Sequence, residues 1–289
     1  IQDLIYDVGM FNGNDTAYYL MKGYRVLAIE ANPLLAQAGA ERFKDEIAKG
    51  KLTVLNCGVS ELAGHADFWV CDENSFWSSF DKSRIEIEHR GHPFHAVQVP
   101  CRTFENILKE YGVPFYLKSD IEGFDHLCVD ALSPDQLPRY CSVEISDVED
   151  LVRLRKKGFN RFKCISQLDL RQVRFDTGVP QSKPEDWRYE KDHWVYAGDA
   201  RGGDWAPYWS FGVFSGPFGE ETDGPWQTFD ETLLAWLKHK LGYAGKRDYG
   251  PQNWYDVHAT RVDESPAEPD ESAFADRFVR LMNSVAGAQ

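Results

Sequence analysis

The sequence predicts an α/β protein built on a mainly parallel sheet with helices on both faces. Between residues 3 and 166, short apolar strand-like runs alternate with helix-like segments. Polar residues and glycines collect where the expected strands end, which is where such sheets bind ligands. Apolar residues make up 43% of the 289 residues, so the chain can bury a sizeable core.

The first part of this pattern predicts three strands and two helices. A polar residue precedes each helix and a glycine follows it, as is typical of helix ends. Asn14 or Asp15 is expected near the first N-cap, and Pro33 is compatible with the first turn of the second helix. The expected elements are a strand at 4–8, a helix at 15–23, a strand at 24–30, a helix at 32–50 and a strand at 51–59.

The next part predicts an insertion and three further strand–helix units. Two strands, at 64–70 and 96–101, read as a hairpin around a polar and aromatic middle. Thr103 is the expected cap of the helix that follows. The remaining elements are helices at 103–112, 125–132 and 147–158, and strands at 114–123, 139–146 and 159–166.

The regular alternation fades after residue 167. Seven of the nine tryptophans lie beyond residue 180, in a Gly- and Pro-rich setting that is too aromatic for a disordered tail. We expect a core at 1–178 with a hairpin-like insertion near 65–101, and a Trp-rich, irregular extension at 179–289 that packs on the core. Within the extension, helices are expected at 227–242 and 273–285.

Charge and composition exclude several classes of partner. The formal net charge is −14, which disfavours a nucleic-acid backbone as substrate. The chain contains no run of about 18 uncharged apolar residues, so no membrane span is expected. None of the six cysteines forms a C-x-x-C pair, so a zinc site is not expected. The cysteines are expected to be reduced thiols, which predicts a cytoplasmic protein.

The loop after the first strand resembles a nucleotide-binding turn but lacks the dinucleotide spacing. Gly9 and Gly13 are separated by three residues, so the G-x-G-x-x-G cradle for a pyrophosphate is missing. Asp7 precedes this loop, and a carboxylate there suits a cationic ligand group. Glu30 ends the second strand, where a carboxylate can accept hydrogen bonds from both ribose hydroxyls. These features predict that the loop binds S-adenosylmethionine. The alternatives are that the glycines only form a tight βα turn and that Glu30 only faces solvent.

Three motifs show a resemblance to a known family. They are D-x-G-x-x-x-G-x-x-T at Asp7–Thr16, E-x-N-P at Glu30–Pro33 and K-x-D-I-E-G at Lys118–Gly123. Over residues 3–166 the chain resembles the FkbM family of S-adenosylmethionine-dependent methyltransferases. The resemblance implies a Rossmann-like class I methyltransferase fold with a seven-stranded sheet, and O-methylation of a hydroxyl on a sugar or a natural product.

The resemblance also implies a set of cofactor-binding residues. They come from the first loop, from the ends of the second and third strands, and from the end of the fourth. The residues are Asp7, Gly9, Asn12, Gly13, Thr16, Glu30, Ala31, Asn32, Gly58, Val59, Ser60 and Asp120. One departure is Met10–Phe11, where such proteins usually carry a small residue before the asparagine.

Charged residues at the end of the fourth strand are the candidates for catalysis. Lys118, Asp120 and Glu122 would point in one direction if the strand stayed regular. Crowded carboxylates raise one another's pKa, which suits a general base. Together with Glu144 they could instead coordinate a divalent cation. A third alternative is that Asp120 and Glu122 only hold loop amides and the cofactor's amino group.

The insertion is expected to recognise the acceptor, because it reaches over the carboxyl ends of the strands. Trp77, Ser78 and Ser79 from the insertion are the candidate substrate contacts. His126, from the helix expected at 125–132, is the fourth. Tryptophans of the extension could stack on a sugar ring or could simply pack in the core. These are Trp205, Trp209 and Trp226.

The sequence therefore predicts an S-adenosylmethionine-dependent O-methyltransferase acting on a hydroxyl of a sugar, glycan or natural product. Two alternatives stay open. One is an NAD-dependent oxidoreductase, against which the missing G-x-G-x-x-G argues. The other is a non-catalytic module that binds S-adenosylmethionine.

Overall fold

The computed structural model describes residues 1–73, 75–88, 91–167, 171–176, 187–190, 193–196, 215–243, 255–262 and 278–280. The chain forms two compact units. The first contains Ile1–Glu144 and Gly203–Gly216, and the second contains Ile145–Gly202 and Pro217–Gln289. The predicted boundary at 178 stays a prediction.

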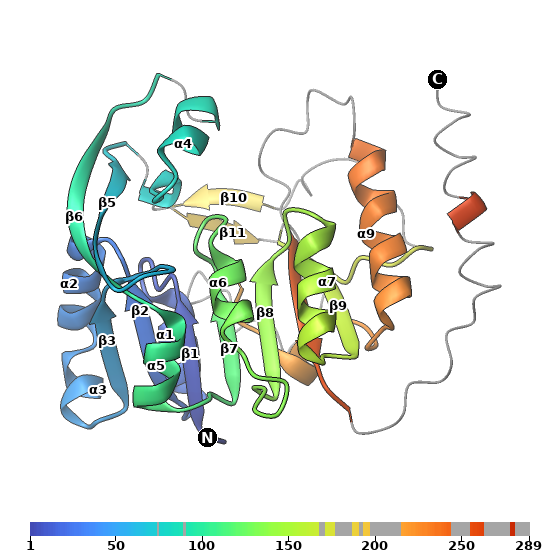
Figure 1. Cartoon of the computed structure of the whole chain (residues 1–289), viewed down its shortest axis with the longest axis horizontal. Helices are drawn as coiled ribbons and strands as arrows, with labels where there is room; N and C mark the ends of the chain where they lie inside the picture. The colour runs from blue at the N-terminus through green and yellow to red at the C-terminus, as the bar shows by residue number, and fades with distance from the viewer. Residues whose placement is uncertain are drawn as a thin grey trace. The chain divides into compact units, whose positions relative to one another are not determined.

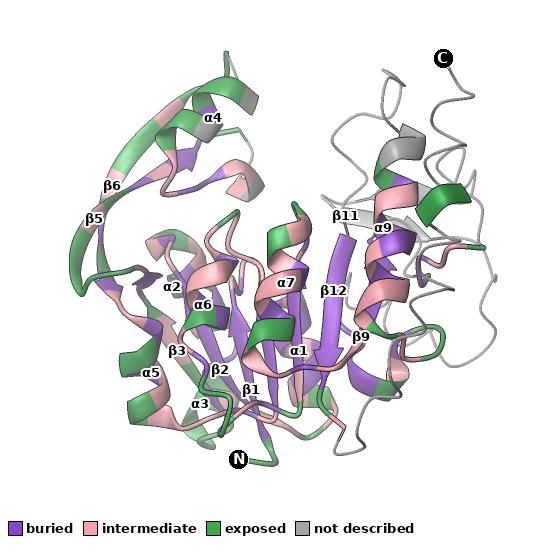
Figure 2. Ribbon diagram, turned by 45° about the vertical axis from the view of Figure 1, so that its right-hand side comes forward, coloured by how far each residue is buried: buried purple, intermediate pink, exposed green. Residues whose placement is uncertain are grey.

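Five parallel strands form the centre of the first unit. They are β1 (Leu4–Val8), β2 (Arg25–Glu30), β3 (Leu52–Asn56), β7 (Tyr116–Ser119) and β8 (Tyr140–Glu144), in the order β3-β2-β1-β7-β8. All five residues of β1 are buried, as expected for a central strand of a parallel sheet (Figure 2). The register places Asp7 beside Lys118 of β7.

Helices alternate with these strands. They are α1 (Asn14–Met21), α2 (Pro33–Arg42), α3 (Lys44–Ala48), α5 (Phe104–Tyr111) and α6 (Asp125–Asp130). Thr103 caps α5 as predicted, because its side chain accepts a hydrogen bond from the Asn106 N–H. The helix expected at 32–50 is two helices, since Phe43 leaves helical geometry. The N-cap of α1 is Gly13 rather than Asn14 or Asp15.

The predicted hairpin is present and belongs to a separate three-stranded sheet. The strands β5 (Gly64–Cys71) and β6 (Phe94–Arg102) pair antiparallel, and β4 (Gly58–Val59) pairs with β6. The strand expected at 51–59 is therefore divided between two sheets. A 3-10 turn, η1 (Ser75–Trp77), and α4 (Lys82–Glu88) lie between β5 and β6.

The second unit contains the remaining elements. They are α7 (Val148–Lys157), β9 (Arg161–Ser166), β10 (Trp187–Glu190), β11 (His193–Tyr196), η2 (Gly219–Glu221), α9 (Phe229–Tyr243) and β12 (Tyr255–Thr260). A capping box formed by Asp147 and Asp150 begins α7. The strand β12 is buried throughout and pairs antiparallel with β9.

The main sheet has seven strands in the order β3-β2-β1-β7-β8-β12-β9 (Figure 1). The prediction of a mainly parallel seven-stranded sheet with helices is confirmed. The helix expected at 227–242 is present as α9, whereas the strand β12 was not predicted within the extension. Of the helix expected at 273–285, only 278–280 lie among the described residues, and they are helical. No helix of the described residues is long and apolar enough to cross a membrane.

Candidate functional site

A buried ion pair lies at the base of the loop between β1 and α1. The Nζ atom of Lys118 is 3.1 Å from Oδ1 of Asp7 and 3.4 Å from Oδ2 of Asp15. It also donates to the carbonyl oxygen of Gly9 at 3.2 Å. The second oxygen of Asp7 accepts a hydrogen bond of 2.6 Å from the Thr16 hydroxyl. The sequence predicted that Asp7 pairs with a cationic group of the ligand. In the structure Asp7 pairs instead with the ammonium group of Lys118.

The charge on Lys118 is strongly favoured. Burial alone lowers the pKa of Lys118, but the carboxylates of Asp7, Asp15 and Asp120 outweigh it and leave that pKa well above its usual value. With 3% of its surface exposed, the lysine holds the loop in place. Its predicted catalytic role has no support in this geometry.

The β1–α1 loop packs closely against the loop that follows β7. Gly9 has a φ of 83°, and a Cβ atom there would lie 1.9 Å from the Asp120 carbonyl oxygen. In the described parts of the chain, two non-glycine residues have positive φ, and each lies in one of these loops. They are Phe11, at 50°, in the β1–α1 loop and Glu122, at 53°, in the loop after β7. Such a conformation costs on the order of 1–3 kcal/mol per residue and is typically retained at functional sites.

Glu30 is held in a defined orientation at the end of β2. Its two carboxylate oxygens accept the backbone N–H groups of Phe11 and Asn32, each at 2.8 Å. Each oxygen keeps one lone pair for another donor, such as a ribose hydroxyl. Burial raises the pKa of Glu30 to about 7, and the charge on Asp7 adds to this shift.

The departure at Met10–Phe11 has a structural explanation. The Met10 side chain is buried against α2, where a Cβ on Gly39 would lie 2.3 Å from its Cε atom. Met10 therefore fills the space beside a glycine of the neighbouring helix. The other loop candidates are built into the same turn: Asn12 accepts from the Asn14 N–H, and Gly13 has a φ of 78°.

The candidates after β3 lie where the insertion joins the core. Gly58 and Val59 form β4 and are buried, and the hydroxyl of Ser60 donates to the Leu62 carbonyl. A Cβ atom on Gly58 would lie 2.2 Å from the Phe80 ring. Ala31 and Asn32 connect β2 to α2. Asn32 caps α2, and Asn56 donates to the Ala31 carbonyl.

Asp120 and Glu122 lie in the loop after β7 and are half-buried. The strand ends at Ser119, so the regular alternation that would align them with Lys118 does not extend to them. Glu144 ends β8 and is also half-buried. Among the residues that the structure describes, no group of three or more His, Cys, Asp or Glu side chains could hold a metal ion. The divalent-cation site considered for Asp120, Glu122 and Glu144 therefore has no support among the described residues and stays a prediction.

Two further aspartates of the site, Asp15 and Asp125, are buried. Asp125 accepts from the Ser119 hydroxyl at 2.7 Å and from the Ile121 N–H at 3.2 Å. Burial and then the charge on Asp120 raise the pKa of Asp125 to about 6. Asp15 contacts Lys118 and accepts from the Gly216 N–H at 2.9 Å. In the sequence both look like ordinary acidic residues of a first helical turn.

The candidate acceptor contacts differ in their surroundings. Ser78 and Ser79 are buried, and their hydroxyls accept from the N–H groups of Cys71 and Asp81. Trp77 is half-buried, with its ring centroid 4.8 Å from that of His92. Both serines therefore stabilise the insertion, and of these three Trp77 is the better placed to meet a ligand.

A row of rings joins the insertion to the β7–α6 loop. The ring centroids of Phe68 and Phe80 are 4.9 Å apart, and those of Phe80 and Phe124 are 6.0 Å apart. Phe124 in turn stacks on His126 at 6.2 Å. The insertion is therefore anchored beside the loop that contains Asp120 and Glu122.

The predicted sugar-stacking tryptophans are only partly described. Trp205 and Trp209 lie outside the described residues. The ring of Trp226 faces the buried Nζ atom of Lys163 at 4.7 Å, and its indole N–H donates to Glu220. Trp226 therefore stabilises the second unit through a cation–π contact.

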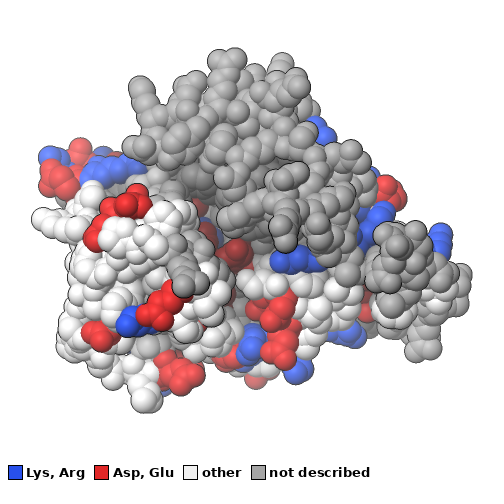
Figure 3. Space-filling model, turned by 90° about the horizontal axis from the view of Figure 1, so that it is seen from above, with Lys and Arg blue, Asp and Glu red and all other residues white. Residues whose placement is uncertain are grey.

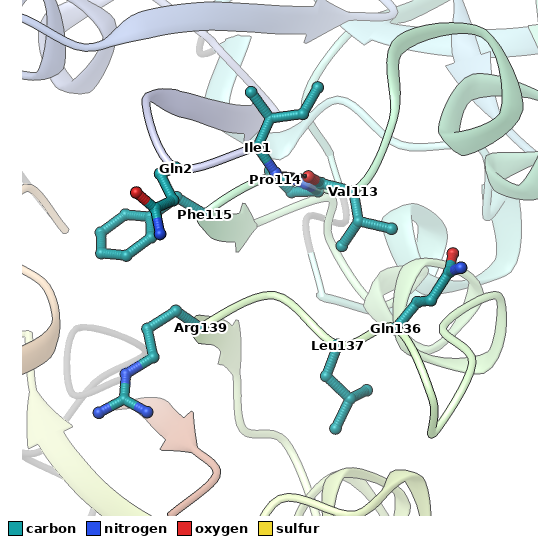
Figure 4. Close-up of a pocket in the computed structure, with 8 residues that line it drawn as sticks. All are labelled: Ile1, Gln2, Val113, Pro114, Phe115, Gln136, Leu137 and Arg139. Atoms are coloured by element: carbon teal, nitrogen blue, oxygen red, sulfur yellow. Dashed lines mark hydrogen bonds between the residues drawn. The ribbon is translucent and has the colours of Figure 1, made fainter.

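A cavity of about 330 Å³ lies away from these residues (Figure 4). Its lining residues precede β1, β7 and β8, so it opens at the amino-terminal edge of the sheet. Open parallel sheets bind ligands at the opposite edge. We therefore assign it no role in catalysis. The lining residues are Ile1, Gln2, Val113, Pro114, Phe115, Gln136, Leu137 and Arg139.

The described surface seen from above carries acidic and basic side chains interspersed (Figure 3). The described part of that face therefore shows no continuous basic patch of the kind that binds nucleic acid.

Residues 7–169 match the family model described as the Methyltransferase FkbM domain. The chain belongs to the FkbM methyltransferase family. The matched range begins within β1, at Asp7, and includes the loops that follow Asp7 and Ser119 and the whole insertion. No curated protein matches the chain.

Three solved structures are similar to this FkbM-family chain. A precorrin-6y C5,15-methyltransferase from Geobacter metallireducens has 10% identity and a TM-score of 0.37, with 90% of this chain and 80% of the other covered. A precorrin-8w decarboxylase from Methanobacterium thermoautotrophicum has 14% identity and a TM-score of 0.33, with coverages of 57% and 67%. A putative methyltransferase from Thermoplasma acidophilum has 6% identity and a TM-score of 0.32, with coverages of 90% and 67%.

Replacing Gly9 by alanine should destabilise the protein. The added Cβ would meet the Asp120 carbonyl, and alanine disfavours the positive φ, so urea unfolding should show a loss of more than about 2 kcal/mol. Gly50→Ala is the matched control, because Gly50 has a φ of 67° with no atom near its Cβ position. It should cost only about 1 kcal/mol. Equal losses for both variants would contradict the close contact at Gly9.

Glu30 should make stability depend on pH. Its folded-state pKa of about 7 lies above the ordinary 4.5, so its contribution is complete below pH 4.5 and is lost as pH rises through 7. Between pH 5 and pH 8, wild type should lose on the order of 3 kcal/mol relative to Glu30→Gln, which cannot ionise. Urea unfolding at both pH values tests this. Parallel pH profiles for the two proteins would show that Glu30 titrates normally.

Proposed function

We propose that this FkbM-family methyltransferase transfers a methyl group from S-adenosylmethionine to a hydroxyl of a sugar, glycan or natural product. The observation that carries the cofactor assignment is the carboxylate of Glu30. It is oriented by two backbone N–H groups at the end of β2, beside a loop without a pyrophosphate cradle. This arrangement favours a nucleoside ligand that lacks a pyrophosphate.

The residues around the loop offer three kinds of contact to such a ligand. Glu30 has acceptor capacity for both ribose hydroxyls. The segment from Gly58 to Ser60 would lie against the adenine, at the junction with the insertion. The loop from Gly9 to Gly13 and the residues beside Asp120 would contact the methionine part of S-adenosylmethionine. Asp7 would act there through Lys118 and Thr16, since both of its oxygens already contact these residues.

The chain's chemical task is alignment and proton removal. Bound S-adenosylmethionine supplies a methyl group that its sulfonium already activates. The protein must hold the acceptor hydroxyl in line with that methyl group, and a general base must take the hydroxyl proton. Asp120 and Glu122 are the candidate bases, because they lie in the loop that packs on Gly9. The positive φ of Glu122 supports a functional constraint at this position.

The insertion is the proposed wall of the acceptor site. The contacts from Phe68 through Phe80 to Phe124 attach it to the loop of the candidate bases. Trp77 belongs to the insertion and His126 stacks on Phe124. Aromatic faces of this kind suit the apolar face of a sugar ring. We also propose a cytoplasmic location, since all six cysteines are free and buried.

Calorimetry with S-adenosylhomocysteine tests the cofactor assignment. Wild type should bind, and Glu30→Ala should weaken binding by at least about tenfold, or 1.4 kcal/mol, because the ribose hydroxyls lose their acceptor. Glu41→Ala is the matched control, since Glu41 is an exposed carboxylate of α2 that pairs only at the surface with Lys44. It should leave the affinity unchanged.

Three outcomes would each contradict a part of this proposal. A wild-type protein that binds NAD and not S-adenosylhomocysteine would favour the oxidoreductase alternative. Equal binding by wild type and Glu30→Ala would remove Glu30 from the ribose site. Binding without methyl transfer to any hydroxyl acceptor of a broad panel would favour a non-catalytic module.

Replacing Asp120 by asparagine should separate binding from chemistry. Asparagine keeps the shape of the side chain but cannot take a proton. Affinity for S-adenosylhomocysteine should stay within about tenfold, or 1.4 kcal/mol, while turnover on an acceptor found with that panel falls by about 10²-fold or more. Glu122→Gln is the parallel variant for the second candidate base. Unchanged turnover in the Asp120 variant would exclude Asp120 as the base.

A further inference from the structure

The cluster beneath the β1–α1 loop contains more acidic than basic groups. One ammonium group, that of Lys118, lies between the carboxylates of Asp7 and Asp15 at 3.1 and 3.4 Å. The side chains of the two aspartates are 0% and 9% exposed. Lys118 balances one of these charges, so Asp15 leaves a surplus negative charge that solvent screens poorly.

Asp15 is fixed in this position from two sides. Its Oδ2 atom faces Lys118, and its Oδ1 atom accepts the Gly216 N–H at 2.9 Å. It also lies in the first turn of α1, where the helix dipole favours a negative charge. The carboxyl group is therefore held in place beside the loop.

Among the residues that the structure describes, neighbouring carboxyl groups add to this surplus. Glu30 and Asp120 add acidic groups, since the pKa of Glu30 responds to Asp7 and that of Lys118 responds to Asp120. On the exposed side of the loop, the Arg42 guanidinium donates to the Asn12 carbonyl and to the Asn14 side chain. This arginine therefore binds the exposed side of the loop, at Asn12 and Asn14.

We propose that Asp15 is a specificity-determining residue that makes the cofactor site prefer the positively charged methyl donor over its neutral product. This inference rests on the proposed function. During transfer, the acceptor oxygen forms a bond to the methyl carbon while the carbon–sulfur bond breaks, and the hydroxyl proton passes to the base. The bonding electrons stay on sulfur, which becomes a neutral thioether. The attraction to the surplus charge ends at that moment, which favours product release.

Calorimetry with two ligands of the same nucleoside tests the preference. S-Adenosylhomocysteine is neutral at sulfur, whereas sinefungin carries an amine-bearing carbon with a positive charge at that place. At pH 7.5 and 0.15 M NaCl, wild type should bind sinefungin at least about tenfold more tightly than S-adenosylhomocysteine. This ratio corresponds to about 1.4 kcal/mol of binding free energy. The preference should persist in 0.5 M NaCl, because salt screens a buried charge weakly.

Asp15→Asn removes the charge and keeps an oxygen for the Gly216 N–H. It should reduce the ratio of the two affinities at least threefold and leave the affinity for S-adenosylhomocysteine within about threefold. Thermal unfolding checks that the variant is folded, and Asp15→Ala repeats the measurement without an amide beside Lys118. Asp45→Asn is the matched control, since Asp45 is exposed in α3 and its loss changes the net charge equally.

The outcomes separate the two proposals. If wild type binds neither ligand, the cofactor assignment fails and this inference fails with it. If wild type binds both ligands equally, or if both Asp15 variants keep the wild-type ratio, the role of Asp15 is overturned while the cofactor assignment stands. A ratio that falls as much in Asp45→Asn would attribute the preference to the overall charge and would also overturn it.

Discussion

The contact between Lys118 and Asp7 is the constraint on which the rest of the site depends. Neither charge could be buried alone, since breaking such a pair typically costs about 3–5 kcal/mol. The pair forms only when β1 and β7 lie side by side in the observed register. The same ammonium group contacts Gly9 and Asp15, so the pairing of two strands also determines the shape of the loop.

The two loops at this edge of the sheet depend on each other. The backbone of Gly9 approaches Asp120 so closely that a side chain at Gly9 has no space. Phe11 and Glu122 adopt an unfavourable backbone conformation on the two sides of this contact. In that conformation Phe11 donates its N–H to Glu30. The strained loop therefore helps to orient the carboxylate that is proposed to bind the ribose. Packing elsewhere must offset this cost.

The sequence singled out residues that the structure brings together at one edge of the sheet, but it did not predict their contacts. Lys118 belongs to the predicted motif, but its burial makes it a partner of Asp7 rather than a group that meets the acceptor. Asp15 was expected only as a helix-capping residue, although it contacts Lys118 and the Gly216 backbone. Each role depends on a partner more than 100 residues away, and a local pattern carries no information about such a partner.

The sequence by itself determined the alternation of strands and helices, the cap at Thr103, the hairpin and the position of Glu30 at a strand end. These features follow from local periodicity and from backbone hydrogen bonds within a few residues. Only the tertiary structure decided that β12 lies in the main sheet, that Phe43 interrupts the second helix, and that Lys118 neutralises Asp7. These depend on long-range packing and on the cost of burying charge, which arise only when distant segments meet.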